Sequence, residues 1–318
     1  MDSEDLHTRR EERRRSVRRR RAGALIALAA ALVAVVVVLA AGSSGSSRSA
    51  GANGSTAAST TKSKPPHGRK TASAVGGPSR TVAVPILMYH VIAAPPTGAP
   101  FPGLYVSPQE FAAQMQALKD AGWHAVTLDQ LRSHWMAGTP LGPGRPIVLT
   151  FDNGYQSQYT QALPVLQRLG WVADENIQLS GLPPSQGGLG QEQIHGLVAA
   201  GWELDTQGFS HADLIKLGPE QLHYEVTVAR SVLQRRYHVP VNWFCYPSGH
   251  YDPTVVAEVR AAGYVGSTTV IPGWAHPGDD PNRLPRLRVL GGTSAQGLLR
   301  LVSGARGEPP APTSYGGA

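Results

Sequence analysis

The sequence has a single cysteine, Cys245, among its 318 residues. No disulfide can form within the chain, so a folded domain has to be stabilised by its hydrophobic core. Acidic residues are absent from residues 42–80, and the basic residues gather before position 81. Residues 81–318 carry 14 basic and 17 acidic side chains, although the whole chain has a formal charge of +7. This distribution argues against a nucleic-acid partner, because the part that can fold is mildly acidic.

No charged residue occurs from Ala22 to Gly42, a stretch of mostly Ala, Leu and Val. As a helix, about 20 such residues span the hydrocarbon core of a bilayer. Nine arginines and five acids precede it in residues 1–21, and this positive flank is expected on the cytoplasmic side. We therefore predict a transmembrane helix at 22–42, a cytoplasmic segment at 1–21 and a globular domain outside the cytoplasm. The alternative, a cleaved signal peptide, usually has a shorter apolar region.

The following segment, residues 43–80, contains no aromatic and no acidic side chain. Such a composition cannot bury a core and is typical of a flexible linker. The last stretch, 304–318, is rich in proline and glycine and is expected to be a disordered tail. The folded domain is therefore predicted at 81–303.

Within this domain, short apolar runs alternate with amphipathic segments, which is typical of α/β proteins. Strands are predicted at or near 84–89, 123–127, 147–151, 176–179, 202–205, 242–246, 264–268 and 287–289. Helices are predicted at 107–119, 128–136, 191–200, 219–237, 252–262 and 295–302. The first of them begins with a capping box, Ser-Pro-Gln-Glu at 107–110. The alternation predicts a deformed or incomplete (β/α) barrel. A flat doubly wound sheet is the alternative, but no glycine-rich phosphate loop follows the first strand.

Polar clusters stand at or beside the ends of several predicted strands, where the active face of a (β/α) barrel is built. They are Thr-Phe-Asp-Asn-Gly at 150–154, Asp-Thr-Gln-Gly-Phe-Ser-His at 205–211, Phe-Cys-Tyr-Pro-Ser-Gly at 244–249 and Leu-Pro-Arg at 284–286. Each of them alone has a structural explanation, since Asp-Asn-Gly and Pro-Ser-Gly are common turns.

Together and in this order, the clusters resemble the motifs of the polysaccharide deacetylase family, the NodB-homology carbohydrate esterases. The first resembles Thr-Phe-Asp-Asp-Gly, the second a His-x-x-x-His motif, and the third Phe-Ala-Tyr-Pro-x-Gly. Pro-Ile-Leu-Met-Tyr-His at 85–90 and the Leu-Pro-Arg cluster match one branch of this family. The resemblance covers about residues 84–303. It implies a deformed barrel and a hydrolase that removes N-acetyl groups from cell-wall or surface polysaccharide.

The same resemblance implies roles for individual residues. Asp152 corresponds to the catalytic base, and the Ser248 N–H to an oxyanion donor. A divalent, zinc-like metal would be held at the positions of Asn153, Gln207 and His211. The remaining residues, expected to bind substrate, are His90, Tyr246, Pro247, Gly249 and Arg286. Arg286 is also expected to pair with Asp152, as an arginine does in other branches of the family.

The sequence departs from the family at the metal. The second aspartate of the first motif is replaced by Asn153, the first histidine of the second by Gln207, and no histidine follows His276. Neutral amides are poorer zinc ligands than carboxylate and imidazole. Asp205, two positions before Gln207 on the same strand face, is an alternative ligand. Two functions stay open, an active deacetylase and a non-catalytic glycan-binding protein on the same barrel.

Overall fold

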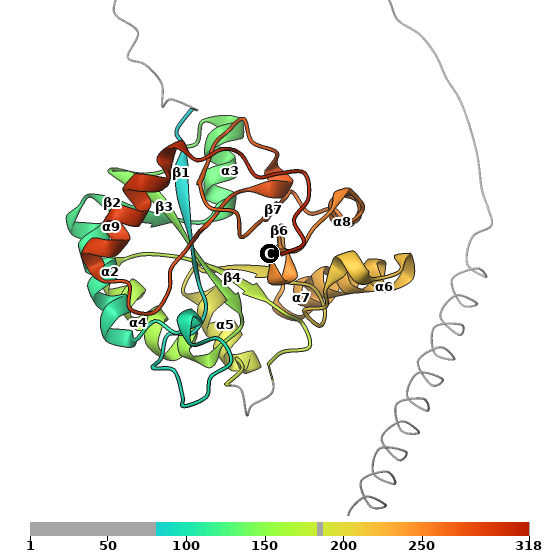
Figure 1. Cartoon of the computed structure of the whole chain (residues 1–318), viewed down its shortest axis with the longest axis horizontal. Helices are drawn as coiled ribbons and strands as arrows, with labels where there is room; N and C mark the ends of the chain where they lie inside the picture. Colours follow the sequence, from blue (N-terminus) through green and yellow to red (C-terminus); the bar gives the residue numbers. More distant parts are fainter. Residues whose placement is uncertain (1–80, 183–186, 318) are drawn as a thin grey trace, which may run out of the picture. The chain divides into compact units, whose positions relative to one another are not determined.

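The structure, a computed structural model, describes residues 81–182 and 187–317. These residues form one sheet of nine strands surrounded by helices (Figure 1). The strands are β1 (Val84–Tyr89), β2 (Trp123–Val126), β3 (Arg145–Asn153), β4 (Asp174–Ile177), β5 (Glu203–Thr206), β6 (Trp243–Cys245), β7 (Gly266–Thr268), β8 (Trp274–Ala275) and β9 (Leu287–Arg288).

The strand order is β7-β6-β5-β4-β3-β1-β8, with β2 also beside β3 and β9 beside β1. All pairs are parallel except β1 with β8. Asp152 on β3 lies opposite Asn176 on β4, which lies opposite Asp205 on β5. Side chains in register point to the same face, so these three face the barrel interior together. The parallel, incomplete (β/α) barrel predicted from the sequence is confirmed.

The helices are α2 (Pro108–Asp120), α3 (Leu128–Ala137), α4 (Leu163–Leu169), α5 (Gln191–Ala199), α6 (Pro219–His223), α7 (Ala229–Tyr237), α8 (Pro253–Ala261) and α9 (Ala295–Gly304). The capping box that predicted α2 is present, because Ser107 and Glu110 each accept the other's main-chain N–H. The single helix expected at 219–237 is divided into α6 and α7 by a π-helical turn, Tyr224–Val228. Neither α4 nor β8 was expected.

The main core fills the space between the sheet and the helices α2, α4 and α9. Tyr89, Phe151 and Trp202 form a stack, with ring centroids 5.6 Å apart in the first pair and 5.0 Å in the second. Phe111 of α2 packs edge-on against Tyr89 at 5.3 Å. All four side chains are buried. Large buried aromatic rings of this kind supply the stability that a disulfide-free domain requires.

The C-terminal segment differs from the prediction. Residues 305–317 do not form a loose tail, because their main chain pairs with the domain. Tyr315 and Tyr251 exchange two main-chain hydrogen bonds of 2.8 Å, and the Tyr251 hydroxyl donates to the Pro312 carbonyl at 2.8 Å. Backbone pairing of this kind depends little on side-chain type, so a Pro/Gly-rich composition does not reveal it.

The predicted segments at 1–21, 22–42 and 43–80 lie outside the described residues. Among residues 81–182 and 187–317, no helix combines the length and the apolar character needed to cross a membrane.

Candidate functional site

A cavity of about 340 Å³ opens at the carboxyl ends of the strands, where the sequence predicts the site. Nine of the predicted site residues line it: His90, Asp152, Asn153, Gln207, His211, Tyr246, Ser248, Gly249 and Arg286. Pro247 is buried beside Ser248 and does not reach the cavity surface. The cavity therefore brings together residues that are far apart in the chain, as the family resemblance implies.

Asp152 and Arg286 form a buried ion pair at the floor of the cavity. Two parallel hydrogen bonds join them, from Nη1 to Oδ1 at 2.8 Å and from Nη2 to Oδ2 at 2.9 Å. The Asn176 side-chain amide donates a third bond to Oδ1 at 2.8 Å. A bidentate pair with a further hydrogen bond fixes the carboxylate in one orientation. The pairing of Arg286 with Asp152 is thus present as expected from the sequence.

These contacts set the charge of the site. Burial alone would raise the pKa of Asp152, but Arg286, His90 and Asn176 hold it at about 2. Burial lowers the pKa of His90 to about 4, although its Nε2 lies 3.9 Å from Asp152 Oδ2. At neutral pH the floor therefore carries an ionised carboxylate and a neutral imidazole.

Gln207 occupies the position of the family's first metal-binding histidine, and both ends of its amide are engaged. Its Oε1 accepts the main-chain N–H of Asn153 at 2.9 Å, and its Nε2 donates to the Cys245 sulfur at 3.2 Å. The side chain is buried. The amide consequently acts as a cross-link between β3 and β6.

The residues present do not fit the divalent metal that the family implies. Asn153 and Gln207 offer only amide groups, the Gln207 carbonyl already accepts a hydrogen bond, and its NH₂ group points at Cys245. His211 remains as the one imidazole of the three positions, and burial lowers its pKa. Within the described part of the chain, no group of three His, Cys, Asp or Glu side chains gathers at this cavity. Zinc sites are built from such groups.

The backbone around the cavity adopts conformations that are rare outside glycine. Asn153, His211 and Ser248 have φ values of 77°, 61° and 56°. Residues in the left-handed region cost about 1 kcal/mol or more and cluster at ligand and active sites. The surrounding structure therefore holds three cavity residues in fixed, mildly strained positions.

Asp205 faces the barrel interior but does not line the cavity. Its Oδ1 accepts the main-chain N–H of Trp243 at 2.9 Å, and its carboxylate lies close to those of Asp174 and Glu203. Two residues along a strand correspond to about 6.6 Å. Asp205 therefore shares a strand face with Gln207 but lies deeper in the barrel. A metal ligand beside His211 would have to lie closer to the cavity.

Sequence reasoning missed four polar side chains in or beside the cavity. Asn176 on β4 and Cys245 on β6 contact Asp152, and Tyr155 and Arg288 line the walls. For Cys245 a signal existed, because it stands where the third motif of the family has alanine. For Asn176 no such signal existed, because motif spacing does not show which strands pair with β4.

Comparisons with known proteins agree with this geometry. Residues 141–267 match the family model described as Polysaccharide deacetylase. The protein YxkH of Bacillus subtilis (strain 168), which carries the name of a polysaccharide deacetylase, is 30% identical over 212 residues, or 66% of this chain and 73% of YxkH. A poly-beta-1,6-N-acetyl-D-glucosamine N-deacetylase of Escherichia coli (strain K12) is 43% identical over 60 residues, 19% of this chain and 9% of that protein.

Solved structures show the same fold. The Streptococcus pyogenes deacetylase PplD, in complex with acetate, has a TM-score of 0.64 and 25% identity, covering 72% of this chain and 100% of PplD. BC0361, a polysaccharide deacetylase from Bacillus cereus, has a TM-score of 0.62 and 27% identity, with 70% and 69% covered.

Proposed function

Since this chain belongs to the polysaccharide deacetylase family, we propose that it binds N-acetylated polysaccharide of the cell surface in the cavity around Asp152. In this proposal, the chain has lost the hydrolysis that depends on a bound metal. The observation that carries it is the amide of Gln207, which bonds to Asn153 and Cys245 where the family has a metal-binding histidine. The cavity, in contrast, is retained.

The chemistry of the cavity supports a sugar as the ligand. Its volume of about 340 Å³ falls within the range of small-molecule sites, and its polar groups include Asp152, the neutral His90 and Arg288. Such groups pair with sugar hydroxyls and with the N–H and C=O of an acetamido group. At the rim, Tyr155 and the 68% exposed Phe101 offer aromatic surface to the apolar face of a sugar ring.

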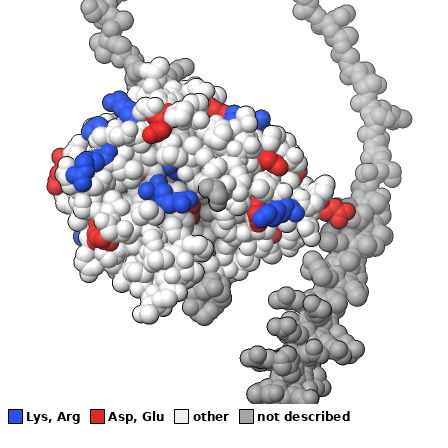
Figure 2. Space-filling model, in the orientation of Figure 1, with Lys and Arg blue, Asp and Glu red and all other residues white. Residues whose placement is uncertain are grey.

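The distribution of charge is consistent with this ligand class. On the face shown in Figure 2, basic and acidic residues are interspersed, and neither sign forms a continuous patch. A neutral or weakly charged glycan suits such a surface better than a nucleic acid does.

The location is part of the same proposal. The charge-free stretch 22–42 would anchor the chain, residues 1–21 would stay in the cytoplasm, and the domain would stand outside, attached through 43–80. Protease treatment of intact cells, with any outer barrier permeabilised, is expected to remove the domain and spare the first 21 residues. Full protection of the domain would contradict this topology.

The binding proposal is tested with the purified full-length chain and N-acetylglucosamine oligomers in calorimetry. We expect acetylated oligomers to bind at least ten times more tightly than the same oligomers without acetyl groups, and Arg288→Ala to weaken this binding. Added zinc should release no acetate. Equal affinity for both oligomers would overturn the proposal.

The loss of the metal site is tested separately. Asn153→Asp with Gln207→His restores a carboxylate and an imidazole beside His211, so this variant is expected to gain one zinc per chain by elemental analysis. His211→Ala in the same background should abolish the gain. Stoichiometric zinc in the wild-type chain that His211→Ala removes would show that the metal site is functional.

N-deacetylation is the second candidate, and one observation favours it. Asp152 is ionised and fixed by Arg286 beside the turn that holds Ser248 at a φ of 56°. A base and a positioned turn are parts of a hydrolytic site. Acetate release by the wild-type chain that is lost in Asp152→Asn, with binding of the oligomer retained, would establish this activity.

A further inference from the structure

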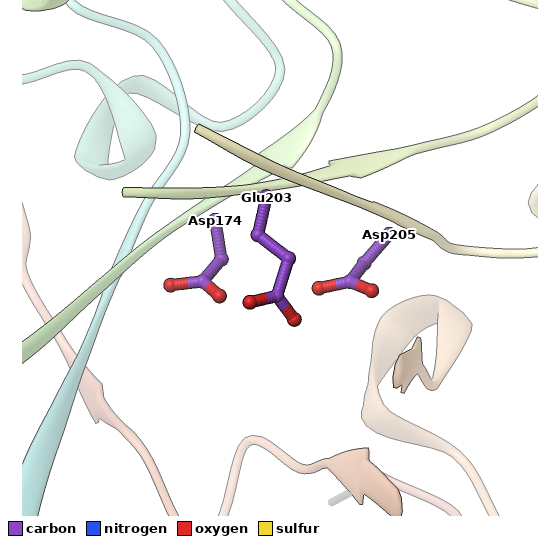
Figure 3. Close-up of side chains that lie close together, drawn as sticks. All are labelled: Asp174, Glu203 and Asp205. Carbon is purple, nitrogen blue, oxygen red and sulfur yellow. The ribbon is translucent and has the colours of Figure 1, made fainter. Parts of the chain in front are cut away.

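A second cluster of acidic side chains lies on the inward face of the sheet, toward the amino ends of β4 and β5. It consists of Asp174, Glu203 and Asp205, and we call it the acid cluster. One carboxylate oxygen from each lies within 4.8 Å of the others, and the three side chains extend into the same space (Figure 3). Asp174 and Asp205 are completely buried. None of the three lines the Asp152 cavity, so the acid cluster is a separate feature.

The backbone holds each carboxylate of the acid cluster in place. Each accepts one main-chain N–H: from Leu128 on Asp174 at 2.9 Å, from Asp129 on Glu203 at 3.1 Å and from Trp243 on Asp205 at 2.9 Å. Two of these donors belong to the first turn of α3, and the third begins β6. The three side chains are therefore positioned by two separate elements, α3 and β6.

The second oxygen of each carboxylate has no hydrogen-bond partner among the residues that the structure describes. Asp174 Oδ2, Glu203 Oε1 and Asp205 Oδ2 are buried and accept no hydrogen bond from the described residues. Within the described chain, no Lys, Arg or His forms an ion pair with the acid cluster. Uncompensated charge is costly in a protein interior, so these groups are neutralised either by bound protons or by a cation.

We propose that the acid cluster binds a divalent cation with all-oxygen coordination, of the Ca²⁺ class. Three fixed carboxylates supply hard anionic ligands, which Ca²⁺ prefers. Ca–O distances of about 2.3–2.6 Å place opposite ligands about 5 Å apart, which accommodates the 4.8 Å spread of the cluster. Mg²⁺ requires shorter distances, and zinc favours nitrogen and sulfur donors.

A surface cavity lies on the side of α3 from which the main chain contacts the acid cluster. Asp129, whose main-chain N–H contacts Glu203, lines this cavity of about 460 Å³. Glu203 is only half-buried, in contrast to the two aspartates. A bound cation would join the ends of β4 and β5 to the start of α3, so its expected effect is to stabilise the barrel.

The experiment uses the full-length chain, stripped with EDTA and dialysed against CaCl₂. We expect one Ca²⁺ per chain by elemental analysis and a rise in melting temperature of roughly 5–10 °C at a hundredfold excess over Kd. Asp205→Asn and, separately, Glu203→Gln should lose both the bound ion and the shift. Two variants are used because either alone could perturb the fold, which circular dichroism checks.

Two controls make the result specific. Glu175→Gln changes an acid on the same strand that is equally buried but points away from the cluster, and it should bind Ca²⁺ like the wild type. His211→Ala should also retain the ion, which separates this site from the cavity around Asp152. A wild-type chain that binds no Ca²⁺, Mg²⁺ or Mn²⁺ would overturn the proposal, and protons shared among the carboxylates would then neutralise the cluster. Binding that survives Asp205→Asn and Glu203→Gln would overturn it as well.

Discussion

Two groups of buried carboxylates on the same face of the same sheet have opposite surroundings. At the carboxyl end, Asp152 faces Arg286 and Asn176, and every oxygen of its carboxylate has a donor. Toward the amino end, the acid cluster has a main-chain donor on one oxygen of each residue and, among the described residues, no side-chain cation. Asp152, Asp174 and Asp205 are buried, and Glu203 is half-buried.

The difference shows that partners, and not burial, decide the ionisation of an interior acid. Burial would raise the pKa of Asp152, yet Arg286 brings it to about 2. Burial raises the pKa of Asp205, and the neighbouring Glu203 raises it further. The same substitution, aspartate to asparagine, is therefore expected to have opposite effects at the two ends of the barrel.

The largest effect is expected at Asp152. Asp152→Asn keeps the shape of the side chain but leaves the buried Arg286 guanidinium without a counter-charge. Removing one partner of such a pair typically costs about 3–5 kcal/mol. Urea denaturation measures the loss. Combining Asp152→Asn with Arg286→Met should return part of the stability, since no charge is then buried alone. A loss below about 1 kcal/mol in the single variant would show that the pair contributes little.

The next effect concerns pH and the neutral His90. Its pKa is about 4 when folded and near 6.5 when unfolded, so the unfolded chain binds the proton first. The stability that depends on neutral His90 is complete above pH 6.5 and is lost as the pH falls to 4, by roughly 3 kcal/mol. His90→Gln should flatten the stability–pH curve in this window only. Parallel curves for the two proteins across pH 4–6.5 would rule out the shift.

At the acid cluster, the change of aspartate to asparagine is expected to raise the free energy of unfolding, whereas at Asp152 it lowers it. In EDTA, Asp205→Asn replaces a carboxyl group whose ionised form is disfavoured by burial and by Glu203 with a neutral amide, so the free energy of unfolding should rise by about 1 kcal/mol. In CaCl₂ the same variant should be less stable than the wild type, because a ligand is missing. Chemical denaturation in the two buffers gives both numbers. Destabilisation by a similar amount in each buffer would indicate a purely structural role for Asp205.

The smallest effect is expected at Glu175. Burial raises the pKa of Glu175 and the charge of Asp152 raises it further, so the ionised form of this side chain is disfavoured. Replacing it by the neutral glutamine should therefore change stability by less than about 1 kcal/mol in either buffer. A change of several kcal/mol would mean that Glu175 is ionised. Neighbouring groups alone would then not explain which buried acids are charged.

Much of this architecture follows from the sequence. Apolar runs located eight of the nine strands, and the capping box at Ser107 marked the start of α2. The short strand β8 was missed because two residues carry no periodicity. The π-helical turn before α7 was missed because it accompanies a tertiary contact that the local sequence does not show. In this turn, the carboxylate of the buried Glu225 accepts the Ser210 N–H.

The motifs predicted which residues meet at the site, but not how deep in the barrel each of them lies. The pairing of Arg286 with Asp152 could be expected from the family. The contacts of Gln207 could not, because they involve the main chain of Asn153 and the unusual Cys245. Asp205 was assigned to the correct face of β5 by alternation. Its distance from the cavity depends on the register of β4 and β5, which no spacing within one segment specifies.

The amide of Gln207 also constrains how this site can evolve. Its two hydrogen bonds join Asn153 to Cys245, and a single change to histidine would break both of them at once. Alanine at 245, the residue typical of the family, would make room for the imidazole but would leave the present glutamine without an acceptor. Each step toward a metal-binding site is thus unfavourable until the others have occurred. Because of such epistasis, a few substitutions can form a lasting barrier. Lineages with this arrangement are therefore not expected to regain the metal site.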